Sequence, residues 1–281
     1  MNDLSTLDSK EMQDLAAILG TAVSSGESSI VRVPELRINA KSVNKNTKKA
    51  IPQGSFYLKN SDKAAYAESV TFRPLASHVQ FFNWDDVDGQ RTLVNKSIAV
   101  LNPYKDEARD MRGSIACGMP SWDDRKEMPY EIAKKWRAMQ HRLVRGLVSY
   151  TGKTEDGEEV FFDNEPCIMF HKNSTYGGFY NDFVKKIPKG HHLYNYEAKL
   201  TSEYNENGSV VWYTFNYEPD LSNMLPFTKL VHDTSIVFAD SIRSENKYID
   251  SQYMKAITEG SIDGSAMKAL DSLDADFEEV V

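Results

Sequence analysis

The sequence predicts a mainly β chain of the α+β class, built as an OB-like antiparallel barrel elaborated with several helices. Two observations carry this prediction. Short aromatic-rich segments of alternating polarity, separated by turn signals, recur between residues 30 and 217. Aromatic side chains make up 11% of the 281 residues, with 14 tyrosines and 13 phenylalanines, which is more than a disordered chain carries. The chain therefore has enough apolar surface to form a core.

The first 29 residues read as an element that precedes the main fold. LSTLDSKEMQDLAAILG, residues 4–20, places leucine, isoleucine and methionine at helical spacing and ends on glycine. TAVSSGESS then reads as a linker. We expect three regions: 1–29 as helix and linker, 30–260 as the barrel core with inserted helices, and 261–281 as a flexible acidic tail.

Strand-like sequence begins at SIVRVPELRINAK and continues in SFYLKN. YAESVTFRPLASHVQFFNWDD predicts two strands or one bent strand, because Pro74 interrupts it. DDVDGQ is a hairpin turn, and RTLVNKSIAVLN returns as a strand. Later, ENGS between LTSEY and VVWYTFNY is a strong hairpin signal.

Three stretches predict helices within the main fold. MPYEIAKKWRAMQHRLVRGLVSY, residues 128–150, carries apolar residues three or four apart. Residues 179–187 form a shorter helical pattern, and residues 234–258 a longer one. A helix between the third and fourth strands of a five-stranded barrel is the OB pattern, and residues 160–217 supply strand, helix and hairpin in that order.

The charge is polarised along the chain, although its net value is −8. Residues 32–63 hold eight bases against two acids, and residues 131–145 five bases against one. Residues 263–279 hold six acids against one base. No apolar run approaches the ~18 residues of a membrane span, and no leader pattern opens the chain. We therefore expect a cytoplasmic protein, in the host cytoplasm if it is viral, with no membrane partner.

Basic and aromatic side chains together suggest a groove for single-stranded nucleic acid. In such a groove, basic side chains neutralise phosphates and exposed aromatic rings stack on unpaired nucleobases. The predicted phosphate contacts are Arg32, Arg37, Lys41, Lys45, Lys48, Lys49, Lys59, Arg73, Lys96, Lys134, Lys135, Arg137, Arg142 and Arg145. The predicted stacking rings are Phe56, Tyr57, Phe72, Phe82, Trp84, Trp212, Tyr213 and Tyr217.

The chain ends in DSLDADFEEVV, an acidic segment with one aromatic ring. Aromatic strands, a basic first half and an acidic tail together resemble the replicative single-stranded DNA-binding proteins of bacteria and their phages. The resemblance covers the layout of residues 30–281 and includes no diagnostic motif. The chain departs from that family at its end, since Val280 and Val281 follow the ring.

The resemblance implies that the tail competes with DNA for the basic groove and recruits replication proteins such as a polymerase or helicase. The tail residues that would do so are Asp271, Asp274, Asp276, Phe277, Glu278 and Glu279. It also implies a non-enzymatic protein of a replication or recombination system, without a cofactor. The sequence leaves the oligomeric state open, with a homo-oligomer among the possibilities.

Two alternatives come from other functional classes. Asp182, Glu197 and Lys199 reproduce the D…ExK skeleton of Mg²⁺-dependent nucleases. A structural or assembly protein would instead use its aromatic strands as a subunit interface. A zinc site at Cys117, Cys167 and His171 is less favoured than a core cysteine beside a polar histidine. No motif for nucleophilic catalysis or phosphate-loop hydrolysis occurs.

Overall fold

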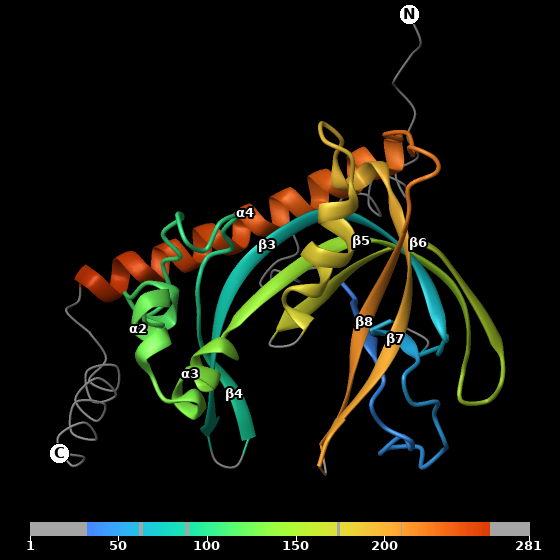
Figure 1. Cartoon of the computed structure of the whole chain (residues 1–281), viewed down its shortest axis with the longest axis horizontal. Helices are drawn as coiled ribbons and strands as arrows, with labels where there is room; N and C mark the ends of the chain where they lie inside the picture. Colours follow the sequence, from blue (N-terminus) through green and yellow to red (C-terminus); the bar gives the residue numbers. More distant parts are fainter. Residues whose placement is uncertain (1–32, 62–63, 88–89, 173–174, 209, 259–281) are drawn as a thin grey trace, which may run out of the picture.

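The computed structural model describes residues 33–61, 64–87, 90–172, 175–208 and 210–258. These residues form a mixed α/β fold, mainly of strands, around one strongly curled, half-barrel sheet (Figure 1). The predicted helix at residues 4–20 and the acidic tail lie outside the described residues. No helix in the described part is long and apolar enough to cross a membrane.

The sheet follows the order β2-β1-β6-β5-β3-β7-β8, with β4 paired to the far end of β3. The strands are β1 (Glu35–Ile38), β2 (Phe56–Lys59), β3 (Ser69–Val87), β4 (Gln90–Lys96), β5 (Gln140–Lys153), β6 (Glu159–Lys172), β7 (Glu197–Asn207) and β8 (Val210–Asp220). All pairs are antiparallel except β1 and β6, which run parallel. Both predicted hairpins are present, at residues 87–90 and 207–210.

Long strands replace the short ones that the sequence suggested. β3 is a single strand of 19 residues, bent by a register shift between Pro74 and Ala76. Gly146 of β5 lies opposite Pro74, and a Cβ there would stand 2.3 Å from the backbone oxygen of Arg73. The backbones of β3 and β5 can approach this closely only because residue 146 lacks a side chain.

The helix predicted for residues 128–150 is wrong over most of its length. α3 (Tyr130–Arg137) accounts for its first third, and residues 140–153 form the central strand β5. β5 is covered on both faces, so apolar residues occur on both sides of the strand, and their spacing also fits a helix. These residues are Leu143, Val144, Leu147 and Val148. Periodicity alone does not distinguish these two structures.

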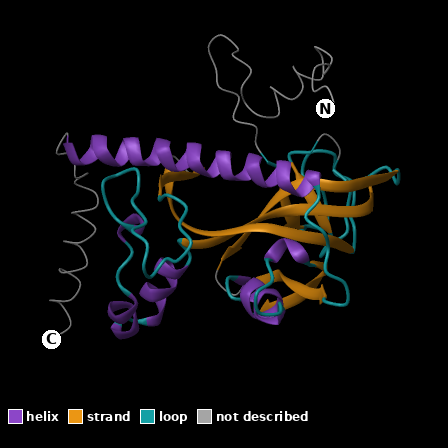
Figure 2. Cartoon of the chain, turned by 90° about the horizontal axis from the view of Figure 1, so that it is seen from above, coloured by secondary structure: helices purple, strands orange, loops and turns teal. Residues whose placement is uncertain are grey.

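The other helices agree better with the sequence. α4 (Lys229–Thr258) begins five residues before the predicted helix and ends with it. Short helical turns occupy η3 (Phe179–Phe183) and η4 (Val184–Lys186), where a short helix was expected, and η5 (Leu193–Asn195) follows. α2 (Trp122–Glu127) and the turn η1 (Ala116–Gly118) complete the described helices. Figure 2 shows α4 on one side of the sheet and η3–η5 on the other.

Two main hydrophobic clusters fill the fold. The larger lies inside the curl of the sheet, on what we call the core face, and includes Phe56, Phe72, Val144, Met169, Phe179, Leu200 and Tyr217. The smaller lies at the far end of β3, where segment 98–117 and Ile249 of α4 pack on Val79 and Phe81. Residues that alternate with the core-face positions point to the opposite side, the outer face.

Candidate nucleic-acid interface

Rings and cations from five strands gather on the outer face. The outer-face row consists of Arg37 and Tyr57 on β1 and β2, Phe170 and Lys172 on β6, and Trp84 and Arg91 on β3 and β4. Arg37 lies directly opposite Tyr57 and forms an ion pair with Glu35 of the same strand at 2.6 Å. Phe170 and Lys172 alternate with the core-face residues Met169 and His171, so they point outward.

A small aromatic cluster supports the middle of the row. The ring centres of Phe82 and Phe170 lie 6.1 Å apart, and those of Phe82 and His141 lie 4.9 Å apart with their planes near perpendicular. Phe82 is 8% exposed and His141 7%, whereas Phe170 is half-buried. Phe170 therefore presents part of its ring on a fixed base of edge-to-face contacts.

Cationic side chains in the outer-face row repel one another. Partial burial lowers the pKa of the Lys172 ammonium, and the guanidinium groups of Arg91 and Arg37 lower it further, whereas Glu35 opposes them. His141 has a pKa of about 4, lowered first by burial and also by Lys172 and Arg91. Cations from β1, β4 and β6 thus affect each other across the strands. A bound polyanion would relieve this repulsion.

Trp84 forms the exposed end of the row. Its side chain is 42% exposed, and the Arg91 guanidinium lies 5.9 Å from the ring centre. Arg91 is also exposed, since β4 is an edge hairpin strand. A ring held by a neighbouring cation, with one side open to water, is suited to stacking on an unpaired base.

A cleft of ≈ 480 Å³ continues the row beyond Arg37. Its walls include Arg37, Tyr57 and Tyr66, and the polar loop that carries Lys41 and Lys45. The rings of Tyr57 and Tyr66 lie 5.6 Å apart at a tilt. Two rings and three cations therefore surround an open space next to the strands.

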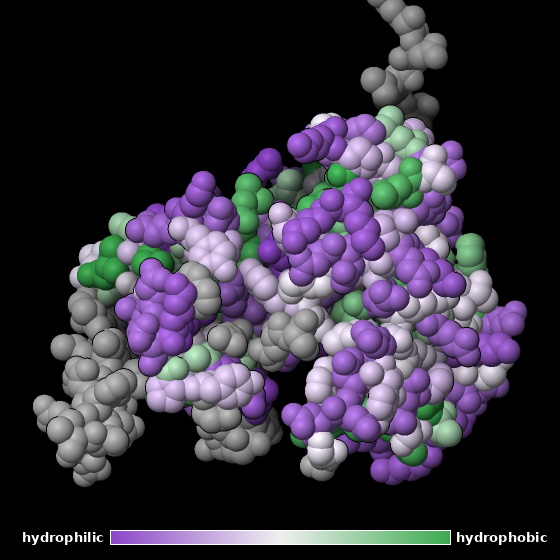
Figure 3. All heavy atoms as spheres, viewed as in Figure 1, coloured by the Kyte–Doolittle hydropathy of each residue, from purple (hydrophilic) through white to green (hydrophobic). Residues whose placement is uncertain are grey.

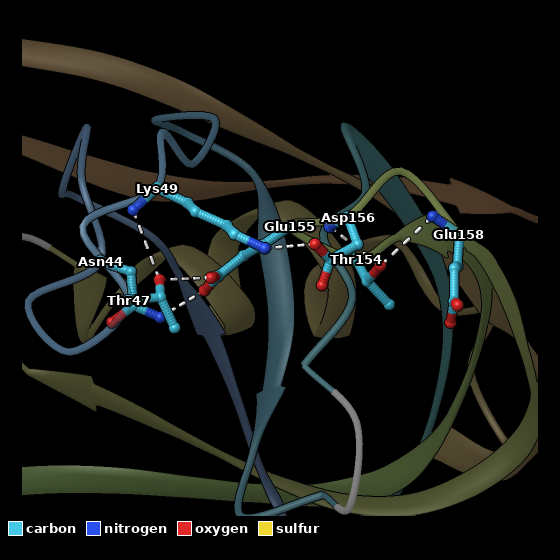
Figure 4. A network of polar contacts seen from close by, with 7 residues as sticks. All are labelled: Asn44, Thr47, Lys49, Thr154, Glu155, Asp156 and Glu158. Atoms are coloured by element: carbon cyan, nitrogen blue, oxygen red, sulfur yellow. Dashed lines mark hydrogen bonds and ion pairs between the residues drawn. The ribbon is translucent and has the colours of Figure 1, made fainter.

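The loop that forms one wall of the cleft is fastened to the β5–β6 turn (Figure 4). Glu155 accepts hydrogen bonds from Asn44 and, at 2.6 Å, from the Thr47 hydroxyl, while the Lys49 ammonium pairs with Asp156. Lys49, predicted to contact phosphate, is thus engaged in holding the loop. This fastening sets where Lys41 and Lys45 stand.

Several other predicted phosphate contacts have structural partners instead. Arg73 donates to the backbone oxygens of Tyr194 and Pro226, and Lys96 forms an ion pair with Glu245 of α4. Arg145 is 4% exposed, and Arg142 lies 5.0 Å from the ring centre of Tyr176. These four bases connect elements of the fold, so we leave them out of the proposed interface.

The remaining predicted bases are spread over the surface or undescribed. Lys48, Lys59 and Lys134 are exposed, and Lys134 lies over the ring of Tyr130 at 5.9 Å. Nothing is described of the side chains of Lys135 and Arg137, on α3. Arg32 and the tail residues Asp271, Asp274, Asp276, Phe277, Glu278 and Glu279 lie outside the described residues.

Half of the predicted stacking rings are buried. Phe56, Phe72, Phe82 and Tyr217 are each at most 8% exposed, so none of them can stack on a base in this structure. Tyr57 and Trp84 are accessible and belong to the outer-face row. Trp212 and Tyr213 are half-buried on the β7–β8 hairpin, where the Tyr213 ring packs over Gly54.

Sequence reasoning missed four residues of this region: Tyr66, Arg91, Phe170 and Lys172. For two of them a signal existed. CIMFHK alternates Cys167, Met169 and His171, which are buried in the core, with Ile168, Phe170 and Lys172. Strand alternation in that text therefore marks Phe170 and Lys172 as outward-pointing neighbours.

The nuclease and zinc patterns do not assemble into sites. Asp182 on η3 influences the buried Tyr217, on the core face, whereas Glu197 and Lys199 alternate with the core residues Ala198 and Leu200. No group of three or more metal-ligating side chains occurs among the described residues. Cys167 and His171 are buried, and His171 is hydrogen-bonded through Nε2 to the Tyr217 hydroxyl at 2.9 Å.

The side of the molecule that carries η3 and η4 is the side opposite α4 (Figure 2). Figure 3 shows a mostly hydrophilic surface there, notched between the lobe with α2 and α3 and the lobe with β7 and β8.

The comparisons with known proteins found no match: no protein-family model, curated protein or solved structure matches the chain.

Proposed function

We propose that the protein binds single-stranded DNA along the outer-face row, as a non-enzymatic component of a phage-type replication or recombination system. The observation that carries the proposal is the meeting of Arg37, Arg91 and Lys172 with Phe170 and Trp84 on one side of the sheet. Cations that track phosphates and rings that stack on bases are what sequence-tolerant single-strand binding requires.

The strand connections support an OB-like barrel as part of this proposal. β3, β5, β6, β7 and β8 are neighbours in the order β6-β5-β3-β7-β8, and η3–η5 lie between β6 and β7. Counted along the chain, these short helices separate the third and fourth of the five strands. OB-folds bind oligonucleotides on the face of strands 2 and 3, which here are β5 and β6. Phe170 and Lys172 lie on that strand pair.

We extend the proposal to the acidic tail, which would occupy the basic row in the absence of DNA and recruit replication proteins when displaced. The support is complementarity of charge, because residues 263–279 carry six acids and one base. Deleting residues 263–281 should tighten DNA binding at low salt and weaken binding to replication partners. Unchanged DNA affinity after the deletion would argue against competition by the tail.

Titration with oligo-dT in rising salt tests the function. We expect tryptophan fluorescence to be quenched on binding, because Trp84 stacks on a base, and the affinity to fall steeply with salt as counterions are released. Trp84→Phe should remove much of the quenching while keeping the binding. Absence of binding at 50 mM salt would refute the proposal.

A further inference from the structure

An apolar groove of ≈ 280 Å³ lies between α4 and β3. Its floor is formed by Leu75, Ala76 and His78 of β3, and its wall by Phe238, Ala239 and Ile242 of α4. The groove is distinct from the outer-face row and from the cleft beside Arg37. No DNA-binding role is suggested by its mostly apolar lining.

α4 is held by few side chains for its length. Of its 30 residues, five are buried: Val231, Thr234, Phe238, Ile242 and Ile249. Ile236, which follows the lining residue Ser235 in α4, is 43% exposed. Most helix stability in proteins comes from the packing of an amphipathic face, so a helix this thinly packed would gain from a further element laid along it.

Two buried polar atoms under α4 have no hydrogen-bond partner among the described residues. They are His78 Nδ1 and Arg145 Nη1. Arg145 is 4% exposed and lies directly opposite Ala76, which lines the groove. Buried polar atoms are rarely left unpaired, because an unmade hydrogen bond there leaves the loss of hydration uncompensated. An acidic or polar group from the groove side would satisfy them.

The chain enters the fold beside this groove. Val33 packs against the cluster of Phe82, Leu143 and Ile168. Leu143 is the direct cross-strand partner of His78, at the groove floor. The 32 residues that precede Val33 therefore join the fold about one strand spacing from the groove, and a 13-residue link (20–32) spans up to about 40 Å.

We propose that residues 4–19 of this chain dock in the groove as an amphipathic helix. Met12, Leu15 and Leu19 lie on one side of such a helix and match the apolar wall. The segment also holds three acids, Asp8, Glu11 and Asp14, against one base. Arg243, which pairs with Asp240, lines the groove, and the buried Arg145 lies opposite the lining residue Ala76. A 16-residue helix is about 24 Å long, comparable to four or five turns of α4.

Thermal unfolding tests the docking. Deleting residues 1–26 should lower Tm by at least about 3 °C, and Leu15→Asp should reproduce most of the loss, because it places a charge against Phe238. Gln13→Asp is the matched control, since residue 13 lies on the opposite side of the helix and should leave Tm unchanged. Equal melting of the deletion variant and the full chain would overturn the proposal.

Cross-linking tests the occupant directly. With Leu15→Cys and Ala239→Cys in one chain, a short bismaleimide should join the two positions within one molecule, and the pair Gln13→Cys with Ala239→Cys should react several-fold less. Cys117 and Cys167 are buried, which keeps the background low. Cross-linked dimers would instead place a second copy in the groove, and equal reaction of both pairs would contradict the docked helix. Neither test depends on DNA binding.

Discussion

The two faces of the curled sheet differ in what their aromatic residues do. On the core face, Phe56, Phe72 and Tyr217 belong to one buried cluster that also includes Phe179 and Phe183 of the short helices, and they have almost no exposure. On the outer face, Tyr57, Phe170 and Trp84 remain accessible, beside Arg37, Lys172 and Arg91. The position of a ring in the strand alternation, more than its type or sequence neighbourhood, decides whether it is buried or accessible.

Neighbouring residues illustrate the point. Phe56 and Tyr57 are adjacent in SFYLKN, yet the first is fully buried and the second borders the cleft. Both were predicted as stacking residues from composition and proximity to bases.

The largest expected effect belongs to the core face. Phe72→Ala should lower the free energy of unfolding by about 3–5 kcal/mol, since it empties a fully buried site against the close approach of Gly146. Denaturant unfolding measures this. DNA affinity of the folded fraction should stay within twofold of the native value. A selective loss of binding without destabilisation would break the division between the faces.

Acid should lower the stability of the fold, because histidines on both faces of the sheet are buried in the neutral form. Burial lowers the pKa of His171 on the core face to about 3 and that of His141 under the row to about 4, from 6.5. On acidification the unfolded chain takes up these protons first, so stability falls from about pH 6.5 toward pH 4 for His141 and toward pH 3 for His171.

The shift at His141 corresponds to roughly 3 kcal/mol. His141→Gln should therefore flatten the decline of stability, measured by denaturant unfolding at pH 7 and pH 4.5. An unchanged pH dependence in this variant would show that His141 is not held neutral in the fold.

Trp84→Ala addresses the outer face. Loss of one stacking platform should weaken oligo-dT binding by about 1–3 kcal/mol, or roughly 5- to 150-fold. Stability should change little, because the ring is 42% exposed. Anisotropy of a labelled oligonucleotide gives the affinity, and a melting curve gives the stability. Unaltered affinity would remove Trp84 from the interface.

Lys172→Gln should have the smallest effect, and a specific one. Removing one phosphate contact should reduce the slope of log K against log salt by about 0.7 for a single strand. Lys247→Gln, on the exposed side of α4, is the control and should leave the slope unchanged. Equal slopes for the two variants would mean that Lys172 does not meet the backbone of the DNA.

Much of the architecture could be predicted from the sequence. Both hairpin turns, α4, and the strand–helix–hairpin order of residues 160–217 follow from local signals such as ENGS and helical periodicity. These features are encoded by residues close in the chain. The parallel pairing of β1 with β6 has no local signal, because it joins residues more than 100 positions apart.

The candidate site was predicted less well, for a physical reason. A stretch of sequence rich in lysine and arginine does not reveal which of these side chains have partners in the fold. Arg73, Lys96 and Lys49 all have partners, in residues 107 to 153 positions away. Arg91 and Lys172 lie in parts of the sequence without an obvious basic cluster. They affect each other only because the folded sheet brings β4 and β6, the strands that carry them, close together. Such convergence is a property of the sheet order.

One paired comparison tests the central claim most directly. Two exposed ring–cation pairs on opposite sides of the sheet give a matched comparison: Trp84 with Arg91 in the outer-face row, and Tyr180 with Lys185 on the side of the short helices, at 5.3 Å. Affinity for labelled oligo-dT should be measured for the double-alanine variant of each pair. We expect at least a tenfold loss for Trp84 and Arg91, and less than twofold for Tyr180 and Lys185. Equal losses, or none for the first pair, would contradict an interface on the outer face.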